Sequence, residues 1–455
     1  MPIAAGIFRQ YDIRGVVGDD LTVQAAGAIG GAFASYLARR GVNRPVAVGR
    51  DNRPSGKALR DALVEALTAS GVDVVDIGVV PTPLLYWSLS HLDVGAGIQI
   101  TGSHNPPEYN GFKICIGTDS VHGEDIQELR RLATRGAFPS GAGTVRHDTV
   151  VDRYVEDIVT RIGPLSRPPR VVLDCGNGAG ALVAPSLFTR LLPDAKCLYC
   201  ESDGTFPNHH PDPTVVENLQ ALIAEVTRGG YDFGVAFDGD ADRIGVVDSA
   251  GRIIWGDYLL ILYARDVLAR TGTGQPIIFD VKCSQALPDA VTRAGGQPIM
   301  WKTGHSLIKG KMKELGAPIA GEMSGHMFFT ESFYGHDDAV YAAARLMRIV
   351  SESGRRIEEL LADVPRFVST PEIRVDCPDD RKFAIVDEAV THFARDHDVV
   401  GVDGARVLFG DGWGLIRASN TQPVLVVRFE ATTAERLAEI QTEMESWLRS
   451  RGVAP

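Results

Sequence analysis

Short apolar runs alternate with amphipathic, alanine- and leucine-rich segments along most of the chain. The segment from Leu21 to Gly41 predicts a helix and Pro45 to Val48 a strand; Pro54 to Ser70 then predicts a second helix and Val72 to Ile77 a second strand. Strands that alternate with helices form βαβ units, which build a largely parallel sheet covered by helices. The order of these segments therefore predicts an α/β fold.

The same alternation of predicted strands and helices begins again twice further along the chain, at Arg170–Asp174 and at Gln275–Asp280. From about Phe367 the pattern changes to consecutive strands closed by a helix from Thr433 to Arg449, which is typical of a small α+β domain with an antiparallel sheet. A chain of 455 residues also exceeds one ordinary hydrophobic core. We expect three similar α/β domains with mixed sheets and a C-terminal α+β domain, arranged around a central cleft. The predicted boundaries are 1–150, 151–255, 256–367 and 368–455.

The composition is that of a soluble globular enzyme, with 44% hydrophobic and 23% charged residues. A formal net charge of -12 argues against general nucleic-acid binding, which needs a basic face. The sequence shows no secretory signal and no apolar stretch of the roughly 20 residues that span a membrane. Six scattered cysteines make no disulfide framework. We therefore expect a cytoplasmic protein.

A serine lies in a tight polar turn immediately after an apolar run. Thr101-Gly102-Ser103-His104-Asn105-Pro106-Pro107 follows Val94–Ile100 directly. Ligands of open α/β sheets bind at the carboxyl ends of the strands. The two prolines stiffen the loop, so they present the hydroxyl of Ser103 at a fixed angle. A serine that only caps a turn is the alternative, and the motifs downstream favour the chemical role.

Three aspartates alternate with the smallest residues between two apolar strands. In Asp238-Gly239-Asp240-Ala241-Asp242 the carboxylates recur at every second position. They can converge on one hard divalent cation, and oxygen ligands with room for phosphate oxygens suit Mg²⁺. An acidic surface turn is the alternative, but three unneutralised carboxylates repel one another. An EF-hand is excluded, because Arg243 stands where glycine is needed and Ser249 where glutamate is needed.

Two further polar motifs, Lys302–Ser306 and Gly321–His326, lie at the ends of predicted strands. Glu322 and Ser324 alternate, so a carboxylate and a hydroxyl could face one ligand and bind sugar hydroxyls. His326 titrates near neutral pH, which suits proton transfer, although a hydrogen-bonded structural histidine is the alternative.

The last domain carries a polar loop, Arg417-Ala418-Ser419-Asn420-Thr421-Gln422-Pro423, with Arg428 following. Arginine with hydroxyl and amide donors around a tight turn matches a phosphate group, and a plain hairpin loop is the alternative.

Two motifs indicate rival functions. Gly176–Ala181 fits the dinucleotide fingerprint, with Glu201 roughly twenty residues on, and suggests a nicotinamide-dependent oxidoreductase. That function explains neither Ser103 nor the aspartates, so we interpret the glycines as permitting close helix–sheet packing. Cys197 and Cys200 form a C-x-x-C, but the flanks suit a strand and no second Cys/His pair lies nearby to complete a zinc site.

Together and in this order, the motifs resemble the α-D-phosphohexomutase superfamily, specifically its bacterial phosphomannomutase/phosphoglucomutase branch. The similarity runs from Tyr11-Asp12-Ile13-Arg14-Gly15 to the Arg417 loop. It implies four domains, three α/β and one α+β, around one cleft. It also implies an isomerase of carbohydrate metabolism, an intramolecular phosphotransferase that interconverts hexose 1-phosphate and hexose 6-phosphate of mannose or glucose.

The resemblance also implies the role of each matched residue. Ser103 would be carried as phosphoserine and would hold Mg²⁺ with Asp238, Asp240 and Asp242. Lys113 and His326 would transfer protons. Arg243 and Arg14 would lie beside the phosphoryl group. The residues implied to bind substrate are Tyr11, Lys282, His305, Glu322, Ser324, Arg417, Ser419, Asn420, Thr421 and Arg428. Glucose 1,6-bisphosphate or mannose 1,6-bisphosphate would serve as intermediate and activator.

Several alternatives stay open. A phosphoglucosamine mutase would look similar around Glu322, although its terminal phosphate loop usually differs from Arg417–Thr421. A Mg²⁺-dependent phosphosugar phosphatase would use an aspartyl nucleophile, as Asp238-x-Asp240 suggests. A phosphosugar-binding protein without catalysis is disfavoured by the intact Ser103 and aspartates. The expected partner is a small phosphosugar, with neither nucleic acid nor membrane, and the expected state is a monomer or homodimer.

Overall fold

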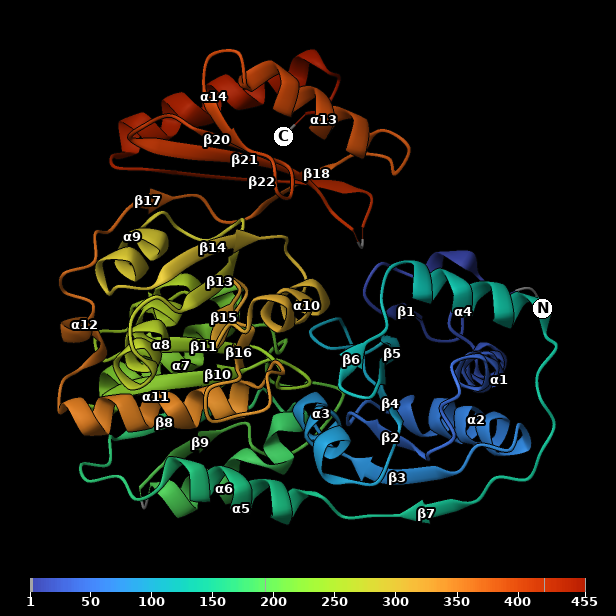
Figure 1. Ribbon diagram of the computed structural model, residues 1–455. Helices are drawn as coiled ribbons and strands as arrows, with labels where there is room; N and C mark the ends of the chain where they lie inside the picture. Colours follow the sequence, from blue (N-terminus) through green and yellow to red (C-terminus); the bar gives the residue numbers. More distant parts are fainter. Residues whose placement is uncertain (1–2, 193, 421, 455) are drawn as a thin grey trace. The chain divides into compact units, whose positions relative to one another are not determined.

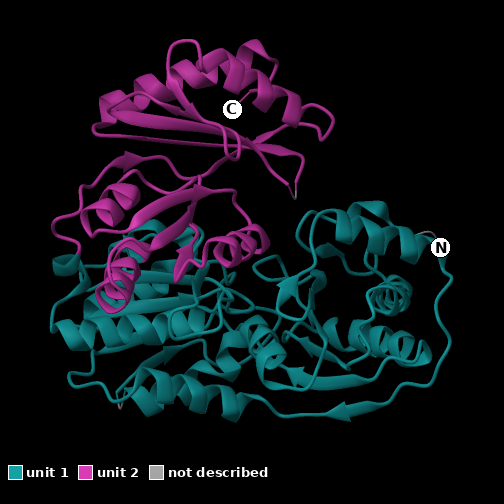
Figure 2. Cartoon of the chain, in the orientation of Figure 1, with its two compact units in different colours: residues 1–259, 324–360 teal, residues 260–323, 361–455 magenta. Residues whose placement is uncertain are grey.

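The computed structural model describes residues 3–192, 194–420 and 422–454, and the chain divides into two compact units (Figure 2). Unit 1 comprises Met1–Leu259 and Ser324–Leu360, and unit 2 comprises Leu260–Met323 and Leu361–Pro455. The chain thus leaves unit 1 within helix α8 (Gly256–Thr271), returns at Ser324 and leaves again after Leu360.

The first sheet of unit 1 is mixed, with the strand order β1-β5-β4-β2-β3-β7 and β6 paired to β5 (Figure 1). Strands β2, β3, β4 and β7 run parallel, whereas β5 is antiparallel to both β4 and β1. The strands are β1 (Ile13–Val16), β2 (Val46–Arg50), β3 (Val74–Val79), β4 (Ala96–Ile100), β5 (Tyr109–Ile116), β6 (Asp119–Ser120) and β7 (Val145–His147). The helices are α1 (Val23–Arg39), α2 (Gly56–Ala69), α3 (Thr82–His91) and α4 (Glu124–Arg135), after a short 3-10 turn η1 (Ala5–Ile7).

Helix α1 illustrates why these segments form as they do. Its first turn is capped by Thr22, whose hydroxyl oxygen accepts a hydrogen bond from the backbone nitrogen of Ala25 at 3.1 Å. Its alanine- and glycine-rich face allows a close approach to α2, because a Cβ at Gly30 would lie 2.6 Å from the backbone oxygen of Leu63. Helix packing here therefore depends on small residues.

The second sheet of unit 1 has the order β12-β11-β10-β8-β9. Strands β8, β9 and β10 are parallel, and β10 forms an antiparallel hairpin with β11 in which Phe237 pairs with Ile244. Every residue of β10 is buried, as its purely apolar sequence predicts. The strands are β8 (Val171–Asp174), β9 (Lys196–Leu198), β10 (Phe233–Phe237), β11 (Ile244–Asp248) and β12 (Ile253–Ile254). Unit 1 also contains α5 (Val151–Ile162), η2 (Ala179–Leu182), α6 (Ala184–Leu191), η3 (Val216–Leu219), α7 (Gln220–Gly229), β16 (Met327–Phe329), α11 (Ala339–Ser353) and α12 (Ile357–Leu360).

Unit 2 contains a parallel set and an antiparallel sheet. The parallel set has β13 between β14 and β15. The antiparallel sheet has the order β17-β22-β21-β20-β19, with β18 also on β22. The strands are β13 (Pro276–Asp280), β14 (Gln297–Trp301), β15 (Ile319–Gly321), β17 (Val368–Ser369), β18 (Ile373–Asp376), β19 (Asp398–Val400), β20 (Ala405–Leu408), β21 (Gly412–Ala418) and β22 (Val424–Ala431). The helices are α9 (Ala286–Arg293), α10 (His305–Leu315), α13 (Lys382–Phe393) and α14 (Ala434–Ser450).

The α/β rhythm and the antiparallel C-terminal sheet expected from the sequence are both present. In this sheet β21 begins at Gly412, because Gly412 and Trp413 pair with Ala431 and Glu430 of β22. The four domain boundaries stay a prediction, because each compact unit contains more than one sheet. Among the described residues, no helix has the length and apolar character needed to cross a membrane.

Candidate active site

Ser103 lies in the loop between β4 and β5 and is buried. Its φ of 50° is in the left-handed region, where a residue with a side chain is strained unless its surroundings hold it. Two contacts do so: the backbone nitrogen of Ser103 donates to Thr101 Oγ1 at 2.9 Å, and Thr101 Oγ1 donates to Asp51 Oδ2 at 2.8 Å. The serine hydroxyl therefore has a fixed direction, as the prolines after it suggest.

A buried arginine fastens the same loop. Arg53 is fully buried, and its Nε lies 3.1 Å from Asp51 Oδ2. Its two terminal nitrogens donate to the backbone oxygens of Ser103 (2.8 Å), Asn105 (2.6 Å), Pro106 (2.5 Å) and Tyr109 (3.1 Å). A Cβ at Gly102 would lie 2.5 Å from Arg53 Cζ, so glycine is required there. The guanidinium of Arg53 thus holds the backbone of the serine loop in place.

The three aspartates lie in the β10–β11 hairpin loop and are all fully buried. One carboxylate oxygen from each of Asp238, Asp240 and Asp242 lies within 4.8 Å of the others. Ser103 Oγ lies 3.2 Å from Asp238 Oδ2. This approach requires Gly239, because a Cβ there would lie 2.4 Å from the backbone oxygen of Ser103. The structure therefore brings the serine and the predicted metal-ligating residues together.

The carboxylates fit a divalent cation. Asp240 Oδ1 is buried and accepts no hydrogen bond from any described residue. Burial, reinforced by the charges of Asp242 and Asp240, raises the pKa of Asp238 well above its usual range. A bound cation would supply the missing partner and relieve this repulsion, and an all-oxygen set of carboxylates beside a hydroxyl is the chemistry that Mg²⁺ prefers.

Lys113, on β5, supplies positive charge to the same loop. Its ammonium lies 2.8 Å from Asp240 Oδ2 and is also paired with Asp242. Burial alone would lower the pKa of Lys113, but the carboxylates of Asp240 and Asp242 raise it above its usual value. Lys113 is therefore an ammonium group at neutral pH and offsets part of the negative charge of the three aspartates.

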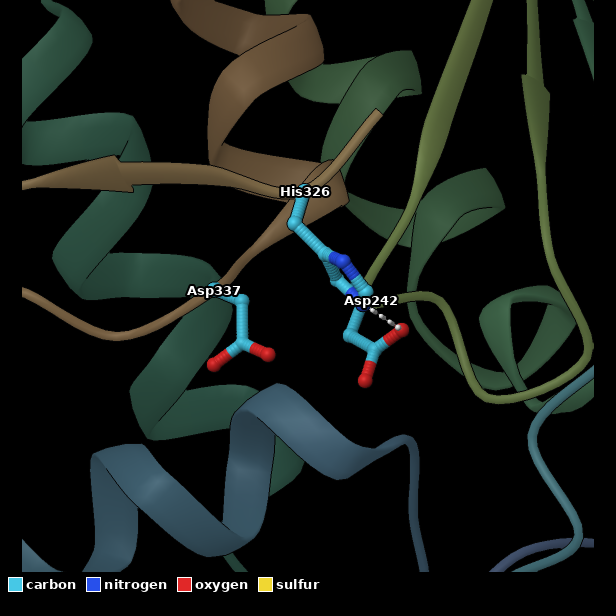
Figure 3. Close-up of side chains that lie close together, drawn as sticks. All are labelled: Asp242, His326 and Asp337. Atoms are coloured by element: carbon cyan, nitrogen blue, oxygen red, sulfur yellow. Dashed lines mark ion pairs between the residues drawn. The ribbon is translucent and has the colours of Figure 1, made fainter. Parts of the chain in front are cut away.

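His326, in the segment just before β16, lies beside Asp242 of the acidic loop (Figure 3). Its Nε2 lies 3.2 Å from Asp242 Oδ1 and 3.3 Å from Arg243 Nε. A neutral imidazole accepts from Arg243 through this nitrogen, and a protonated one donates to Asp242, so both charge states have a partner. Asp337 completes this cluster, since its carboxylate lies within 4.8 Å of Asp242 and His326 ligand atoms.

Two predicted arginines border the serine loop and the acidic loop. Arg14, on β1, donates to Asn105 Oδ1 at 3.0 Å and to Asp12 Oδ2 at 2.6 Å. The backbone nitrogen of Arg243 donates to Asp238 Oδ1 at 3.1 Å. Tyr11 is half-buried just before β1. These positions give the site fixed positive charge for an anionic group.

The other predicted residues lie mostly in unit 2. Lys282 Nζ lies 3.1 Å from Glu372 Oε2, and Arg417 Nε lies 3.0 Å from Asp403 Oδ2. Lys282 lowers the pKa of Glu372 to about 2, which keeps this carboxylate charged. The remaining positions are His305 at the start of α10, Glu322 after β15, Arg428 on β22, and Ser419 and Asn420 after β21. Ser324 belongs to unit 1, and Thr421 lies outside the described residues.

Sequence reasoning missed four residues that shape the site. Asp51, Arg53, His104 and Asp337 were not singled out, although His104 Nδ1 lies 3.2 Å from Ser103 Oγ. Burial, reinforced by the charge of Arg243, lowers the pKa of His104 well below its usual value, so this ring is neutral. The signal for Asp51 and Arg53 was a D-x-R at the end of a predicted strand; the signal for Asp337 was a pair of acids just before a helix.

The acidic loop leads to a metal-binding prediction. We expect Asp240→Asn to weaken Mg²⁺ binding about 10- to 100-fold, because it removes one charged ligand from a buried set. Isothermal titration with MgCl₂ measures this directly. Glu217→Gln, an exposed acid in the same unit, is the matched control and keeps the wild-type affinity. Equal affinities for all three proteins would contradict the assignment.

Comparisons with known proteins agree with this geometry. Models of phosphoglucomutase/phosphomannomutase match in chain order: alpha/beta/alpha domain I at residues 5–139, domain II at 152–251, domain III at 255–367 and the C-terminal domain at 372–446. A phosphomannomutase/phosphoglucomutase of Pseudomonas aeruginosa is 49% identical over 450 residues, covering 98% of this chain and 96% of the relative. The chain belongs to the phosphoglucomutase/phosphomannomutase family.

Further members of this family extend the match. A phosphoglucomutase of Neisseria meningitidis serogroup A is 45% identical over 453 residues, covering 98% of both chains. A crystal structure of a phosphoglucomutase/phosphomannomutase family protein from Burkholderia thailandensis superimposes with a TM-score of 0.92 at 44% identity, covering 98% of both chains.

Family membership confirms the α-D-phosphohexomutase assignment, the multidomain α/β fold with its C-terminal domain, and an isomerase of the phosphohexomutase type. The nicotinamide-dependent alternative is excluded. The glycines that suggested it, Gly178 and Gly180, instead pack against the acidic loop, since a Cβ at these positions would lie 2.8 Å from Gly239 O and 3.2 Å from Ala241 Cβ.

Proposed function

We propose that this chain interconverts the 1-phosphate and 6-phosphate of a hexose, mannose or glucose, through a phosphoserine at Ser103 and a hexose 1,6-bisphosphate. The observation that carries the proposal is the contact of Ser103 Oγ with Asp238 Oδ2 at 3.2 Å, within a loop fixed by Arg53. A serine that carries a phosphoryl group between sugars must lie close to a cation that offsets the phosphate charge. The position of Ser103 beside the three aspartates meets this requirement.

In the forward half of the reaction, phosphoserine donates its phosphoryl group to a sugar hydroxyl. Ser103 acts as the leaving group, and its loop keeps the attack in line with the P–O bond. Asp238, Asp240 and Asp242, with an oxygen of phosphoserine, would hold Mg²⁺, which would neutralise charge on the transferring group. Lys113 and Arg243 add fixed positive charge beside it.

Proton transfer in this scheme falls to Lys113 or His326. His326 Nε2 has an acceptor and a donor partner within 3.3 Å, so it can gain or lose a proton without losing a hydrogen bond. In the first half, the attacking sugar hydroxyl loses its proton and Ser103 Oγ gains one as it leaves. In the second half, the hydroxyl of Ser103 loses its proton as it attacks the other phosphate, and the sugar oxygen that leaves gains one.

The non-reacting phosphate is assigned to unit 2. Arg417, Ser419, Asn420, Thr421 and Arg428 would bind it, and Tyr11, Lys282, His305, Glu322 and Ser324 would bind the rest of the sugar. The bisphosphate must present each end in turn to Ser103, so the distal site has to accept either phosphate. A loop that binds phosphate by charge and hydrogen bonds, with no sugar-specific contact, meets that need.

The relatives give the proposed substrates. The Pseudomonas aeruginosa relative is named for both mannose and glucose, and the Neisseria meningitidis relative for glucose. We assign both sugars to this chain, since they differ only at the C2 hydroxyl. A cytoplasmic location and a monomer or homodimer stay predictions.

One assay tests the function. Purified enzyme with Mg²⁺ and a trace of glucose 1,6-bisphosphate is given mannose 1-phosphate, glucose 1-phosphate or glucosamine 1-phosphate in separate reactions, and the 6-phosphates are measured. We expect turnover of both sugars, dependence on the bisphosphate, and no steady release of inorganic phosphate. Steady phosphate release without the bisphosphate would instead identify the phosphatase, and turnover of glucosamine 1-phosphate alone would identify the glucosamine mutase.

A further inference from the structure

Three of the six cysteines gather in unit 1, apart from the acidic loop. Cys175 is the first residue after β8, Cys197 lies in β9, and Cys200 follows that strand. The Sγ atoms of Cys200 and Cys175 are 3.2 Å apart. The parallel register places Cys197 opposite Leu173, which is two residues before Cys175 and on the same side of the strand. The C-x-x-C therefore has a third thiol that the sequence alone did not reveal.

The three thiols differ in exposure. Cys175 is buried, Cys200 is half-buried and Cys197 is exposed, whereas Cys115, Cys283 and Cys377 are buried elsewhere. The neighbouring thiols of Cys175 and Cys200 lower the pKa of Cys197 to about 4. The thiolate is the reactive form of cysteine, so an exposed thiolate backed by two thiols is suited to oxidation.

A metal does not account for this trio. Among the described residues, the groups of side chains close enough to hold an ion are Asp238 with Asp240 and Asp242, and Asp242 with His326 and Asp337. The three thiols are not such a group, and the contact on which covalent chemistry can build is that between the sulfur atoms of Cys175 and Cys200.

The position of Cys175 connects the trio to the active site. Four residues on, the backbone nitrogen of Ala179 donates to the backbone oxygen of Gly239 at 2.8 Å, and Gly239 itself packs on Ser103. The intervening Asn177 has a φ of 59° and accepts a hydrogen bond from Asn52 at its backbone oxygen. A short, tightly turned loop therefore connects Cys175 to the acidic loop.

We propose that Cys175, Cys197 and Cys200 form a peroxide-oxidised thiol site in which a disulfide to Cys175 lowers the mutase activity. The Cys197 thiolate attacks hydrogen peroxide; an S–O bond forms, the O–O bond breaks, and hydroxide leaves and is protonated to water. The Cys175 thiol then attacks the sulfenic sulfur; an S–S bond forms, the S–O bond breaks, and a second water leaves. Two thiols are oxidised and one peroxide is reduced. Cys200 can take the place of Cys197 in this bond by thiol–disulfide exchange.

Tryptic cleavage distinguishes the possible disulfides. Residues 171–190 contain Cys175, and residues 197–228 contain both Cys197 and Cys200, with cleavage sites at Arg170, Arg190, Lys196 and Arg228. The enzyme is treated with hydrogen peroxide, its remaining thiols are alkylated after denaturation, and its peptides are weighed. We expect the two peptides as one cross-linked species, which dithiothreitol separates.

Variants and activity complete the test. We expect peroxide to lower turnover of glucose 1-phosphate severalfold, with recovery in dithiothreitol, and we expect Cys175→Ser to resist this loss. Cys377→Ser is the matched control and stays sensitive. A peptide 197–228 that is two hydrogens lighter, without any cross-link, would overturn the assignment of Cys175. A cross-linked enzyme with unchanged turnover would overturn the link to the active site. The peptide result does not depend on mutase activity, so the thiol site and the proposed function fail separately.

Discussion

Replacing Ser103 with alanine is expected to lower mutase turnover about 10³-fold or more while phosphosugar binding changes little, because the variant has no oxygen to carry the phosphoryl group. The side chain is small and the loop is held by Arg53 and Thr101 through backbone atoms. The fold of the loop therefore survives the change. Steady-state assay of glucose 1-phosphate turnover gives the rate, and isothermal titration with glucose 6-phosphate gives the affinity.

Two further measurements make this result specific. Mass spectrometry of the wild-type chain should locate one phosphoryl group on Ser103, and the alanine variant should lack it. Ser140→Ala, at an exposed serine in the same unit, should keep both activity and phosphorylation. A Ser103→Ala enzyme with wild-type turnover would refute the phosphoserine mechanism altogether.

Replacing Arg53 with methionine is expected to lower the stability of unit 1 by about 3–5 kcal/mol, because it leaves the buried carboxylate of Asp51 without its cation. The change also removes the donors to four backbone oxygens of the serine loop. Calorimetry should show an unfolding transition several degrees lower. Turnover should fall as well, since Ser103 would lose the support of its left-handed backbone.

The matched variants separate charge from geometry. Arg53→Lys retains the positive charge beside Asp51 but cannot donate in the planar pattern of a guanidinium, so it should recover part of the stability and little of the turnover. Arg39→Met removes an arginine from an exposed pair with Glu128 and should change stability by less than about 1 kcal/mol. An Arg53→Met protein that unfolds at the wild-type temperature would show that the buried network is dispensable.

The helices and strands could be predicted from the sequence where the spacing of apolar residues indicates them. Helix α1 and strand β13 lie within a few residues of their predicted ranges, because a continuous apolar stripe or run marks each of them. Antiparallel β5 was not foreseen, since the run from Tyr109 to Ile116 mixes polar and apolar residues. Its inward polar residue, Lys113, is explained only by the carboxylates that it meets.

The candidate site was predictable where one loop carries the chemistry. The aspartate trio and Ser103 stand out as local motifs, and the structure brings them within hydrogen-bond distance. The supporting residues could not be found in this way, because Arg53 contacts Ser103 across 50 positions and Asp337 comes from a segment far from Asp242. Cys175 likewise meets Cys200 only through the pairing of β8 with β9. Long-range partners of this kind leave no periodic signal.

The ammonium group of Lys113, lying between Asp240 and Asp242, has a consequence for how the ion is acquired. The acidic hairpin carries an internal counterion, so it is preorganised as a receptor before any ion arrives. An ion that binds there would therefore find a preformed site and would not drive the folding of this loop. A chelator should abolish the activity reversibly and leave the fold unchanged.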